Sequence, residues 1–537
     1  MARGLARAWA RVAVGRKILF ITTDQQRYDT VGANGGTLAR TPVIDRLAAE
    51  GIRYTRCQPT SVVCMPSRAS MLTGQYPSTH GVWMNGVALP IDAPSVAEEL
   101  HDLGYATALI GKAHFEPFLD PFGRFVENSL ATLGVATLEQ PWFGGRRGVH
   151  RGFDHLEFAT HGVLGPLHYA RWMRERHPEA LGGFYAVLDG DLNVNDEGGG
   201  DNGAPQVKFN DVPPEWYHTN WVADRTIEWL ESQPDDGDWF CWMSFPDPHH
   251  PWDPPASELG RVNWRDVELP INYPEAAQQR ESLLDQKARH WRAWYDGRVV
   301  SNYEAPAKWV PATMTANQVR EVNALNAVEV ELIDEAIGRV LANLSRRGRL
   351  EDVDVFFTSD HGELQGDFGL LFKGPYHVDG LLRLPMIWRP APSSAPRAAV
   401  VTTPVSLVSL AATFLDVAGR SAPEWVEGEV LPSSDEQVAC SRDRATVTEW
   451  DSSLFGVDVH LRTVVTREYL YTQYGNGTMH DGSEGELYDL RDDPLQRVNL
   501  FNDPARRAAR DELAQRLLEH QDRPSPRARP GDLVAPV

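Results

Sequence analysis

Short apolar runs recur along the chain and are separated by amphipathic segments. The runs lack the alternating polar positions of a half-exposed strand, which is typical of strands buried on both faces. The predicted strands are Ile18–Thr23, Ala106–Ile110, Trp239–Phe245, Val353–Thr358 and Met386–Trp388. Because helical patterns fall between these strands, the order of elements predicts an α/β fold with a large mixed, mostly parallel sheet sandwiched by helices.

Local signals mark where several helices begin. Thr41-Pro42 has the form of an N-cap followed by proline at the first helical position. Ser95 and Glu98 have the spacing of a capping box. A long helical pattern covers 316–344. The regions 120–215 and 254–315 have weak periodicity and are predicted to be long loops that shape the substrate side.

The pattern changes after Val417. Val459–Val465 and Tyr469–Tyr474 alternate apolar and polar residues, which predicts a hairpin, and 504–520 follows as a helix. These elements predict a smaller C-terminal α+β domain. The expected divisions are a basic leader at 1–16, a catalytic α/β domain at 17–420, the C-terminal domain at 421–522 and a flexible tail at 523–537.

Composition excludes some classes of protein. The chain has 537 residues and a net charge of −22, which disfavours nucleic-acid binding because the chain repels phosphate backbones. Arginines interrupt the basic N-terminus, so no secretory signal is predicted. No segment approaches the ~20 apolar residues of a membrane span, so no membrane partner is expected. The predicted location is the cytoplasm, and self-association into a homo-oligomer stays open.

Unusual polar residues follow four of the predicted strands. They are Asp24-Gln25, Lys112 with His114, Asp247 with His249, and Asp360-His361. In open α/β sheets, ligands bind beyond the carboxyl ends of the strands. Oxygen donors at Asp24, Gln25 and Asp360, with nitrogen from His361, suit Ca²⁺, Mg²⁺ or Mn²⁺. The sequence therefore predicts a site for one divalent metal ion.

Cations and imidazoles complete the predicted chemistry. Arg68, Lys112 and Lys373 could hold a tetrahedral oxyanion, and His114 and His249 could move protons. Taken singly, each residue also fits an ordinary structural role, such as a helix cap, a solvated lysine or a surface histidine. Their convergence at one sheet edge favours sulfuryl or phosphoryl transfer.

One segment carries a family resemblance. Cys64-Met65-Pro66-Ser67-Arg68, with the continuation to Thr73-Gly74, resembles the sulfatase signature C-x-P-S-R followed by a short helix and Thr-Gly. Six further segments also resemble sulfatase motifs: Asp24–Arg27, Thr41–Ala48, Gly111–His114, Asp247–His249, Thr358–Glu363 and Phe372–Gly374. Glu486–Leu490 is similar to the final segment of the family, so the resemblance covers most of the chain.

The resemblance implies a mechanism for sulfate monoesters of the arylsulfatase type, on small-molecule or glycan substrates. In sulfatases, a formylglycine-generating enzyme oxidises the cysteine, and one hydroxyl of the hydrated aldehyde attacks sulfur. Cys64 would be that precursor. The residues implied to ligate the metal, Ca²⁺ before Mn²⁺ or Mg²⁺, are Asp24, Gln25, residue 64, Asp360 and His361.

The other implied roles surround the nucleophile. Lys373 and His249 bind the substrate and assist the leaving oxygen, and His114 accepts a proton from the second hydroxyl, which expels sulfate. Arg68 and Lys112 keep the hydrated aldehyde and the metal ligands in position. A serine would lack the second hydroxyl, which gives a chemical reason for the modified cysteine.

The chain departs from the common sulfatase pattern in two places. It has Asp24-Gln25 and Asp360-His361 where many sulfatases have Asp-Asp and Asp-Asn. These versions are similar to bacterial arylsulfatases and to phosphonate monoester hydrolases, and Asn85 is a substrate-binding candidate shared with the latter. Lys112 and His114 favour the sulfatases. A phosphonate monoester or phosphodiester hydrolase therefore stays open, as do a non-catalytic anion- or glycan-binding protein and a structural partner-binding protein.

Overall fold

The computed structural model describes residues 16–118, 125–134, 136, 148–189, 191, 194–300, 304–306, 308–391 and 399–521. Residues 1–15 of the predicted leader and the whole predicted tail lie outside the described residues. The division at residues 420 and 421 stays a prediction.

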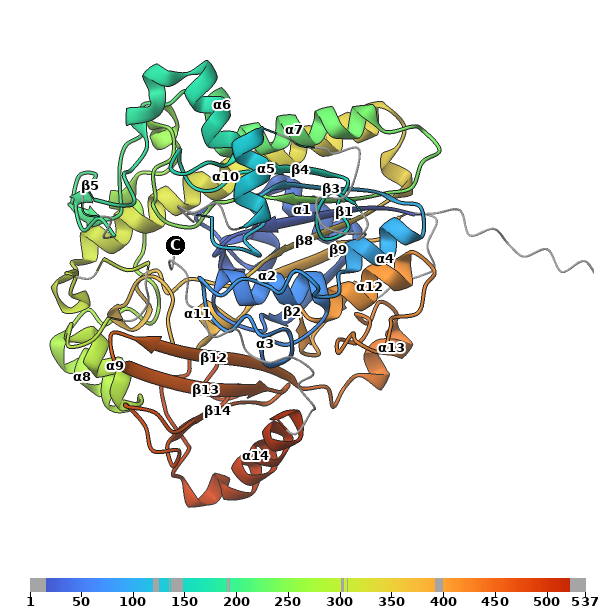
Figure 1. Cartoon of the computed structure of the whole chain (residues 1–537). Coiled ribbons are helices and arrows are strands. Elements are labelled where there is room, and N and C mark those ends of the chain that lie inside the picture. The colour runs from blue at the N-terminus through green and yellow to red at the C-terminus, as the bar shows by residue number, and fades with distance from the viewer. Residues whose placement is uncertain are drawn as a thin grey trace, which may run out of the picture.

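A nine-stranded sheet lies at the centre of the described structure (Figure 1). Its order is β10-β2-β9-β8-β1-β7-β3-β4, with β11 also paired to β2. The strands are β1 (Lys17–Thr23), β2 (Ile52–Gln58), β3 (Ala106–Gly111), β4 (His155–Phe158), β7 (Trp239–Ser244), β8 (Val353–Ser359), β9 (Leu384–Arg389), β10 (Val400–Val401) and β11 (Val405–Ser406). Only β9 is antiparallel to its neighbours, β2 and β8, so the predicted mixed, mostly parallel sheet is confirmed.

Helices cover both faces of this sheet (Figure 1). One layer contains α2 (Cys64–Thr73), α4 (Val96–Asp102), α5 (Val126–Leu133) and α12 (Ser409–Val417). The opposite layer contains α1 (Pro42–Glu50), α6 (His168–Arg176), α7 (His218–Ser232) and α10 (Ala316–Arg346). Along β1, Phe20 packs into the first layer and Leu19 and Ile21 into the second. This two-sided burial explains why the strand is apolar at successive positions.

Two helix starts differ from the local signals in the sequence. The Thr41 side chain does not cap α1; its hydroxyl accepts from Gly32 N instead. The first amides of α1 donate to Asp334 on α10, so a neighbouring helix supplies the cap. At α4, Ser95 accepts from Ala97 N, at the second helical position rather than the third position of a capping box.

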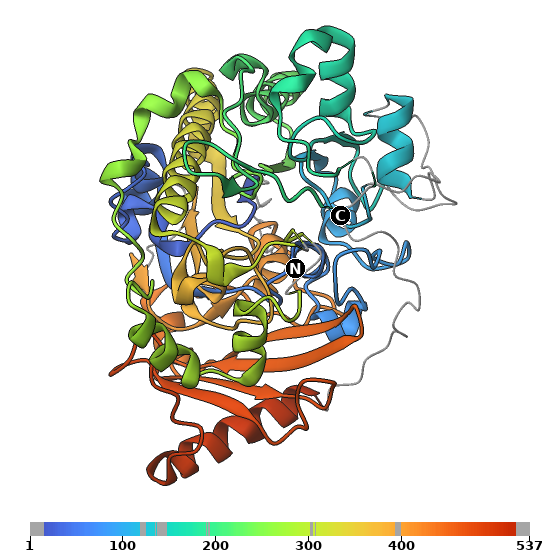
Figure 2. The same ribbon diagram turned by 90° about the vertical axis from the view of Figure 1, so that its left-hand side faces the viewer.

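A second, antiparallel sheet forms the predicted C-terminal α+β region. Its order is β12-β13-β14-β15, with strands β12 (Thr446–Leu454), β13 (Val457–Val465), β14 (Tyr469–Tyr474) and β15 (Gly485–Asp489). The predicted hairpin is β13 and β14. Helix α14 (Arg507–Gln521) packs on the sheet face that points away from the large sheet (Figure 2). On the other face, Trp450 and Leu461 pack with Trp291 and Tyr376 of the large domain.

The remaining helices are short. They are α3 (Pro77–His80), α8 (Ala277–Asp285), α9 (Arg289–Tyr295), α11 (Asp379–Leu382) and α13 (Asp435–Cys440). A two-stranded ribbon, β5 (Gly198–Gly199) with β6 (Ala204–Pro205), lies in the region predicted to be loops. Across the described part of the chain, no helix is both long and apolar enough to span a bilayer.

Candidate active site

The predicted site residues gather where four adjacent parallel strands end. The strands β8, β1, β7 and β3 lie side by side, and each is followed by the polar residues that the sequence pattern singles out. Gln25 N donates to Asp360 Oδ1 at 3.0 Å, which joins the ends of β1 and β8. Asp24 N donates to the Asp247 carbonyl at 3.0 Å, which joins β1 to the end of β7. Parallel pairing therefore builds the site from segments far apart in sequence.

Arg68 holds the two acidic residues of this edge. It lies in the second turn of α2 and is fully buried. Its Nε donates to Asp360 Oδ2 at 2.7 Å, its Nη2 to Asp24 Oδ2 at 3.3 Å and its Nη1 to the Lys112 carbonyl at 2.7 Å. Lys112 Nζ lies 2.5 Å from Asp24 Oδ2. Burial would raise the pKa of Asp24, but Lys112 and Arg68 are among the groups that hold it well below its ordinary value.

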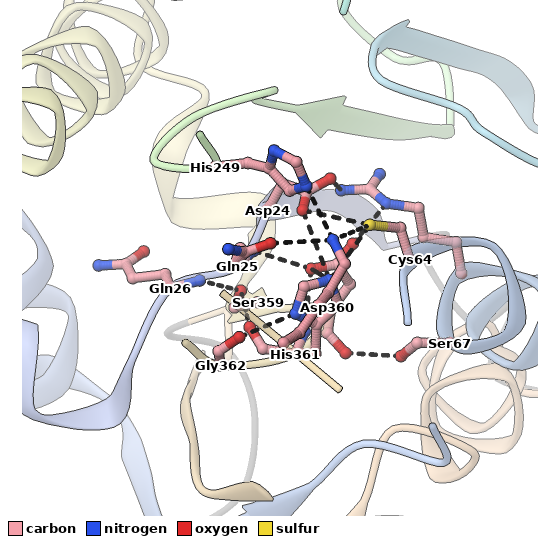
Figure 3. A network of polar contacts seen from close by, with 12 residues as sticks. Asp24, Gln25, Gln26, Cys64, Ser67, His249, Ser359, Asp360, His361 and Gly362 are labelled. Carbon is pink, nitrogen blue, oxygen red and sulfur yellow. Dashed lines mark hydrogen bonds and ion pairs between the residues drawn. The ribbon is translucent and has the colours of Figure 1, made fainter. Parts of the chain in front are cut away.

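Four side chains could hold a metal ion at one point. Ligand atoms of Asp24, Cys64, Asp360 and His361 all lie within 4.8 Å of one another (Figure 3). His361 Nδ1 lies 2.9 Å from the Gly362 carbonyl, so Nε2 is the nitrogen that faces Cys64. Two carboxylates and one imidazole are ligands that fit a hard divalent cation. Gln25 is also a predicted metal ligand. Its side-chain oxygen Oε1 accepts a hydrogen bond from Lys373 Nζ at 2.9 Å.

Cys64 begins helix α2 and lies against these groups. Its Sγ is 3.1 Å from His361 Nε2, 3.2 Å from Lys373 Nζ and 3.6 Å from Asp24 Oδ1 (Figure 3). Burial, together with the charge of Asp24, raises the pKa of this thiol. The unmodified side chain therefore stays a protonated thiol at neutral pH, which is a weak nucleophile.

Lys373 and His249 form a pair beside Cys64. Lys373 Nζ lies 2.8 Å from His249 Nε2, and His249 Nδ1 faces the His250 carbonyl. Burial lowers the pKa of His249, and the charge of Lys373 lowers it further. Burial alone would lower the pKa of Lys373, but neighbouring acidic groups raise it, so Lys373 is the protonated member of the pair. The group that can give up a proton here is therefore Lys373, with His249 as its acceptor.

His114 follows β3 with a left-handed backbone, at φ 58°. Neither ring nitrogen has a hydrogen-bond partner among the described residues, although the ring is buried. Burial and the charge of Lys112 lower the pKa of His114. A neutral imidazole with its ring nitrogens unengaged is suited to accept a proton.

Sequence reasoning missed Glu304 and assigned no role to His161, His250 and Glu363. Glu304 comes from the region 254–315, and its carboxylate contacts Asn85, His249 and Lys373. The His161 ring stacks on His249 with centroids 4.4 Å apart. Glu363 belongs to the segment Thr358–Glu363, which resembles a sulfatase motif, so the sequence indicated that this residue lies near the site. The sequence around Glu304 contains no such indication.

A buried nucleophile precursor, paired carboxylates and fixed cations at the carboxyl edge of a parallel sheet are the features of a hydrolase that acts on anionic esters. Comparison with known proteins identifies the family. The sulfatase family profile matches residues 16–420, and a profile described as N-sulphoglucosamine sulphohydrolase, C-terminal, matches 366–523. The chain belongs to the sulfatase family and is a sulfuric ester hydrolase.

Individual relatives agree along nearly the whole chain. An uncharacterized sulfatase of Escherichia coli (strain K12) is 28% identical over 94% of this chain and 87% of its own length. An arylsulfatase of Clostridium perfringens (strain 13 / Type A) is 27% identical over 90% of each chain. The solved phosphonate monoester hydrolase of Agrobacterium radiobacter has the same fold, with a TM-score of 0.72, 23% identity and coverage of 94% of this chain and 95% of its own.

Proposed function

We propose that the protein hydrolyses sulfate monoesters, with aryl sulfates as model substrates, through a formylglycine formed from Cys64 and one divalent metal ion. The observation that carries this proposal is the position of Cys64, whose Sγ lies within 3.6 Å of Asp24, His361 and Lys373. The raised pKa of the thiol supports conversion, because the unmodified cysteine would be a protonated, soft ligand beside a hard metal site. A formylglycine-generating enzyme would have to supply the modification.

The metal would be held by Asp24, Asp360 and His361 together with residue 64, with Gln25 beside them; Ca²⁺ is favoured, and Mn²⁺ and Mg²⁺ are the alternatives. When bound, it would act as a Lewis acid that polarises the ester and lowers the pKa of a coordinated hydroxyl. Arg68 keeps Asp24 and Asp360 in place through its two ion pairs.

Each proton transfer of the reaction can be assigned to a residue of the protein. Lys373 is charged and adjacent to residue 64, so it stabilises and protonates the departing oxygen. His249 orients Lys373 by accepting its hydrogen bond at 2.8 Å. His114 is neutral and partnerless among the described side chains, so it accepts the proton that accompanies sulfate release.

The nearest alternative is a phosphonate monoester or phosphodiester hydrolase on the same fold. Asn85 favours this alternative, since it resembles a position shared with those hydrolases; its Oδ1 accepts from Met65 N at 3.0 Å and its Nδ2 donates to Glu304. Lys112, which pairs with Asp24, and His114 favour the sulfatase, because phosphonate monoester hydrolases carry Tyr and Thr at these two positions.

Two measurements on one sample test the proposal. Peptide mass spectrometry should find residue 64 as formylglycine, and the converted protein should hydrolyse an aryl sulfate with higher kcat/KM than the matched aryl phosphonate or phosphate.

Cys64→Ser should stop after one turnover with a sulfated serine, and Cys64→Ala should be inactive. Cys440→Ser, at an exposed cysteine far from this chemistry in sequence, is the matched control. Repeated turnover by Cys64→Ser at the wild-type rate would refute the mechanism, and a preference for the phosphonate would move the function to the alternative.

A further inference from the structure

The carboxylate of Glu304 occupies the position expected for the substrate's ester group. Its Oε1 accepts from Asn85 Nδ2 at 2.5 Å. Its Oε2 lies 2.5 Å from Lys373 Nζ and 3.0 Å from His249 Nε2. These three partners are the residues that the sequence assigned to substrate binding. Ligand atoms of Glu304, Cys64 and His249 also lie within 4.8 Å of one another, so the carboxylate reaches the nucleophile itself.

Glu304 remains ionised in this position. Burial alone would raise its pKa, but the charge of Lys373 and the other basic groups lower it to about 2. Its side chain is only 11% exposed. A sulfate ester that takes over the contacts with Asn85, His249 and Lys373 would therefore displace this carboxylate and lie beside a negative charge that water screens poorly.

A cavity adjoins Glu304 on the substrate side of the site. This small cavity of about 40 Å³ opens beside Lys112, His114 and His249, and none of the proposed metal ligands is among the residues that line it. Much of its wall is apolar: Phe118, Leu164, Val187, Val194 and Pro251. Of the described residues that line it, Glu304 alone carries a carboxylate, while the cation Lys112 is already paired with Asp24. The cavity thus offers an alcohol group a hydrophobic wall with one negative charge at the ester end.

We propose that Glu304 determines specificity and selects sulfate esters whose alcohol is compact, largely apolar and positively charged near the ester oxygen. This inference rests on the proposed function, and it names the substrate class of the same site. A positive charge on the alcohol pairs with Glu304 once the ester has displaced it from Lys373 and His249. A negative charge on the alcohol, as in a polysulfated or uronate-containing glycan, is repelled by it.

The test compares three phenyl sulfates that differ in one meta substituent: trimethylammonio, hydrogen or carboxylate. Values of kcat/KM are measured on full-length protein with residue 64 converted. The wild type should prefer the cationic ester to the anionic one. Glu304→Gln should reduce that preference about 10-fold or more, the effect of removing one poorly screened unit charge near the substituent. Glu304→Asp, which keeps the charge, should retain the preference.

Glu268→Gln is the matched control, because it removes one carboxylate from an exposed position in the same region, 254–315. It should leave all three rates unchanged. An unchanged preference in Glu304→Gln, or a wild type that hydrolyses the anionic ester at least as fast as the cationic one, overturns the role of Glu304 while leaving the sulfatase mechanism intact. A converted wild type that hydrolyses none of the three sulfates refutes the proposed function and this inference together.

Discussion

Arg68→Met should destabilise the protein strongly without metal and much less with it. Arg68 is fully buried and bridges Asp360 and Asp24 at 2.7 and 3.3 Å. Methionine fills a similar volume but leaves both carboxylates without this cation. Lys112 still pairs with Asp24, so the uncompensated charge falls mainly on Asp360. Removing one partner of a buried ion pair costs about 3–5 kcal/mol, which is the loss in free energy of unfolding that we expect in EDTA.

A divalent ion should reverse most of that loss, because it places positive charge between the same two carboxylates. The metal should therefore stabilise Arg68→Met more than it stabilises the wild type, and a hundredfold excess over the variant's Kd should stabilise the variant by about 2.7 kcal/mol. Urea unfolding followed by tryptophan fluorescence, with EDTA or with Ca²⁺, Mn²⁺ or Mg²⁺, measures both numbers.

Two variants control this experiment. Arg68→Lys keeps the charge but loses the fork of donors, so an intermediate loss is expected. Arg176→Met, at an exposed position at the end of α6, should change stability by less than about 0.5 kcal/mol. The reasoning is refuted by an Arg68→Met loss below about 1 kcal/mol in EDTA, or by a loss that is the same with and without metal.

Three further substitutions test other parts of the site. His114→Ala should slow sulfate release more than attack, so mass spectrometry should find the covalent sulfated enzyme accumulating during turnover. Lys373→Ala should reduce kcat most for esters with poor leaving groups, and equal losses for activated and unactivated esters would contradict its role as proton donor. Burial raises the pKa of Asp247 to about 7, even though the hydrogen bond from Thr219 lowers it. The folded state therefore binds this proton more tightly than the unfolded state, so stability should fall as the pH rises from about 4 to about 7. Asp247→Asn should remove that slope, worth at most about 4 kcal/mol, and an unchanged pH profile of urea unfolding would contradict it.

The sequence predicted the strands that are buried on both faces and missed those that are not. β1 and β8 are apolar at successive positions because helices cover both sides of them, so their pattern is visible without the fold. β2 (Ile52–Gln58) lies towards the edge of the sheet, where it pairs with short strands. It includes Arg53 and Arg56, and these polar residues interrupt the apolar run by which a buried strand is predicted. β4 is only four residues long, too short for a periodic signal.

The same distinction holds for the site. Residues directly after parallel strands could be predicted to meet, because the strand ends define one edge, and the structure brings Asp24 and Asp360 together through Arg68. Glu304 could not be predicted, since its position depends on contacts with Asn85 and Lys373, which lie far from it in sequence. The cap of α1 by Asp334 is another contact across a large separation in sequence that no local pattern records.

The charges around Cys64 bear on which ester the site can accept. Among the described residues they form pairs of carboxylates and cations: Asp24, Asp360 and Glu304 with Arg68, Lys112 and Lys373. Glu363, whose pKa burial raises to about 7, adds less than one full negative charge. The protein alone is therefore close to neutral here, and a divalent ion would leave an excess of about two positive charges.

A monoanionic ester cancels only part of that excess, and the remainder can stabilise the negative charge that develops on the leaving oxygen in the transition state. A dianionic phosphate monoester would cancel nearly all of it in the ground state. Charge balance thus favours sulfate monoesters, together with the equally monoanionic phosphonate monoesters and phosphodiesters, over phosphate monoesters. Of the ranking expected from the paired-ester assay, it therefore predicts the preference for aryl sulfate over aryl phosphate and leaves sulfate and phosphonate equal.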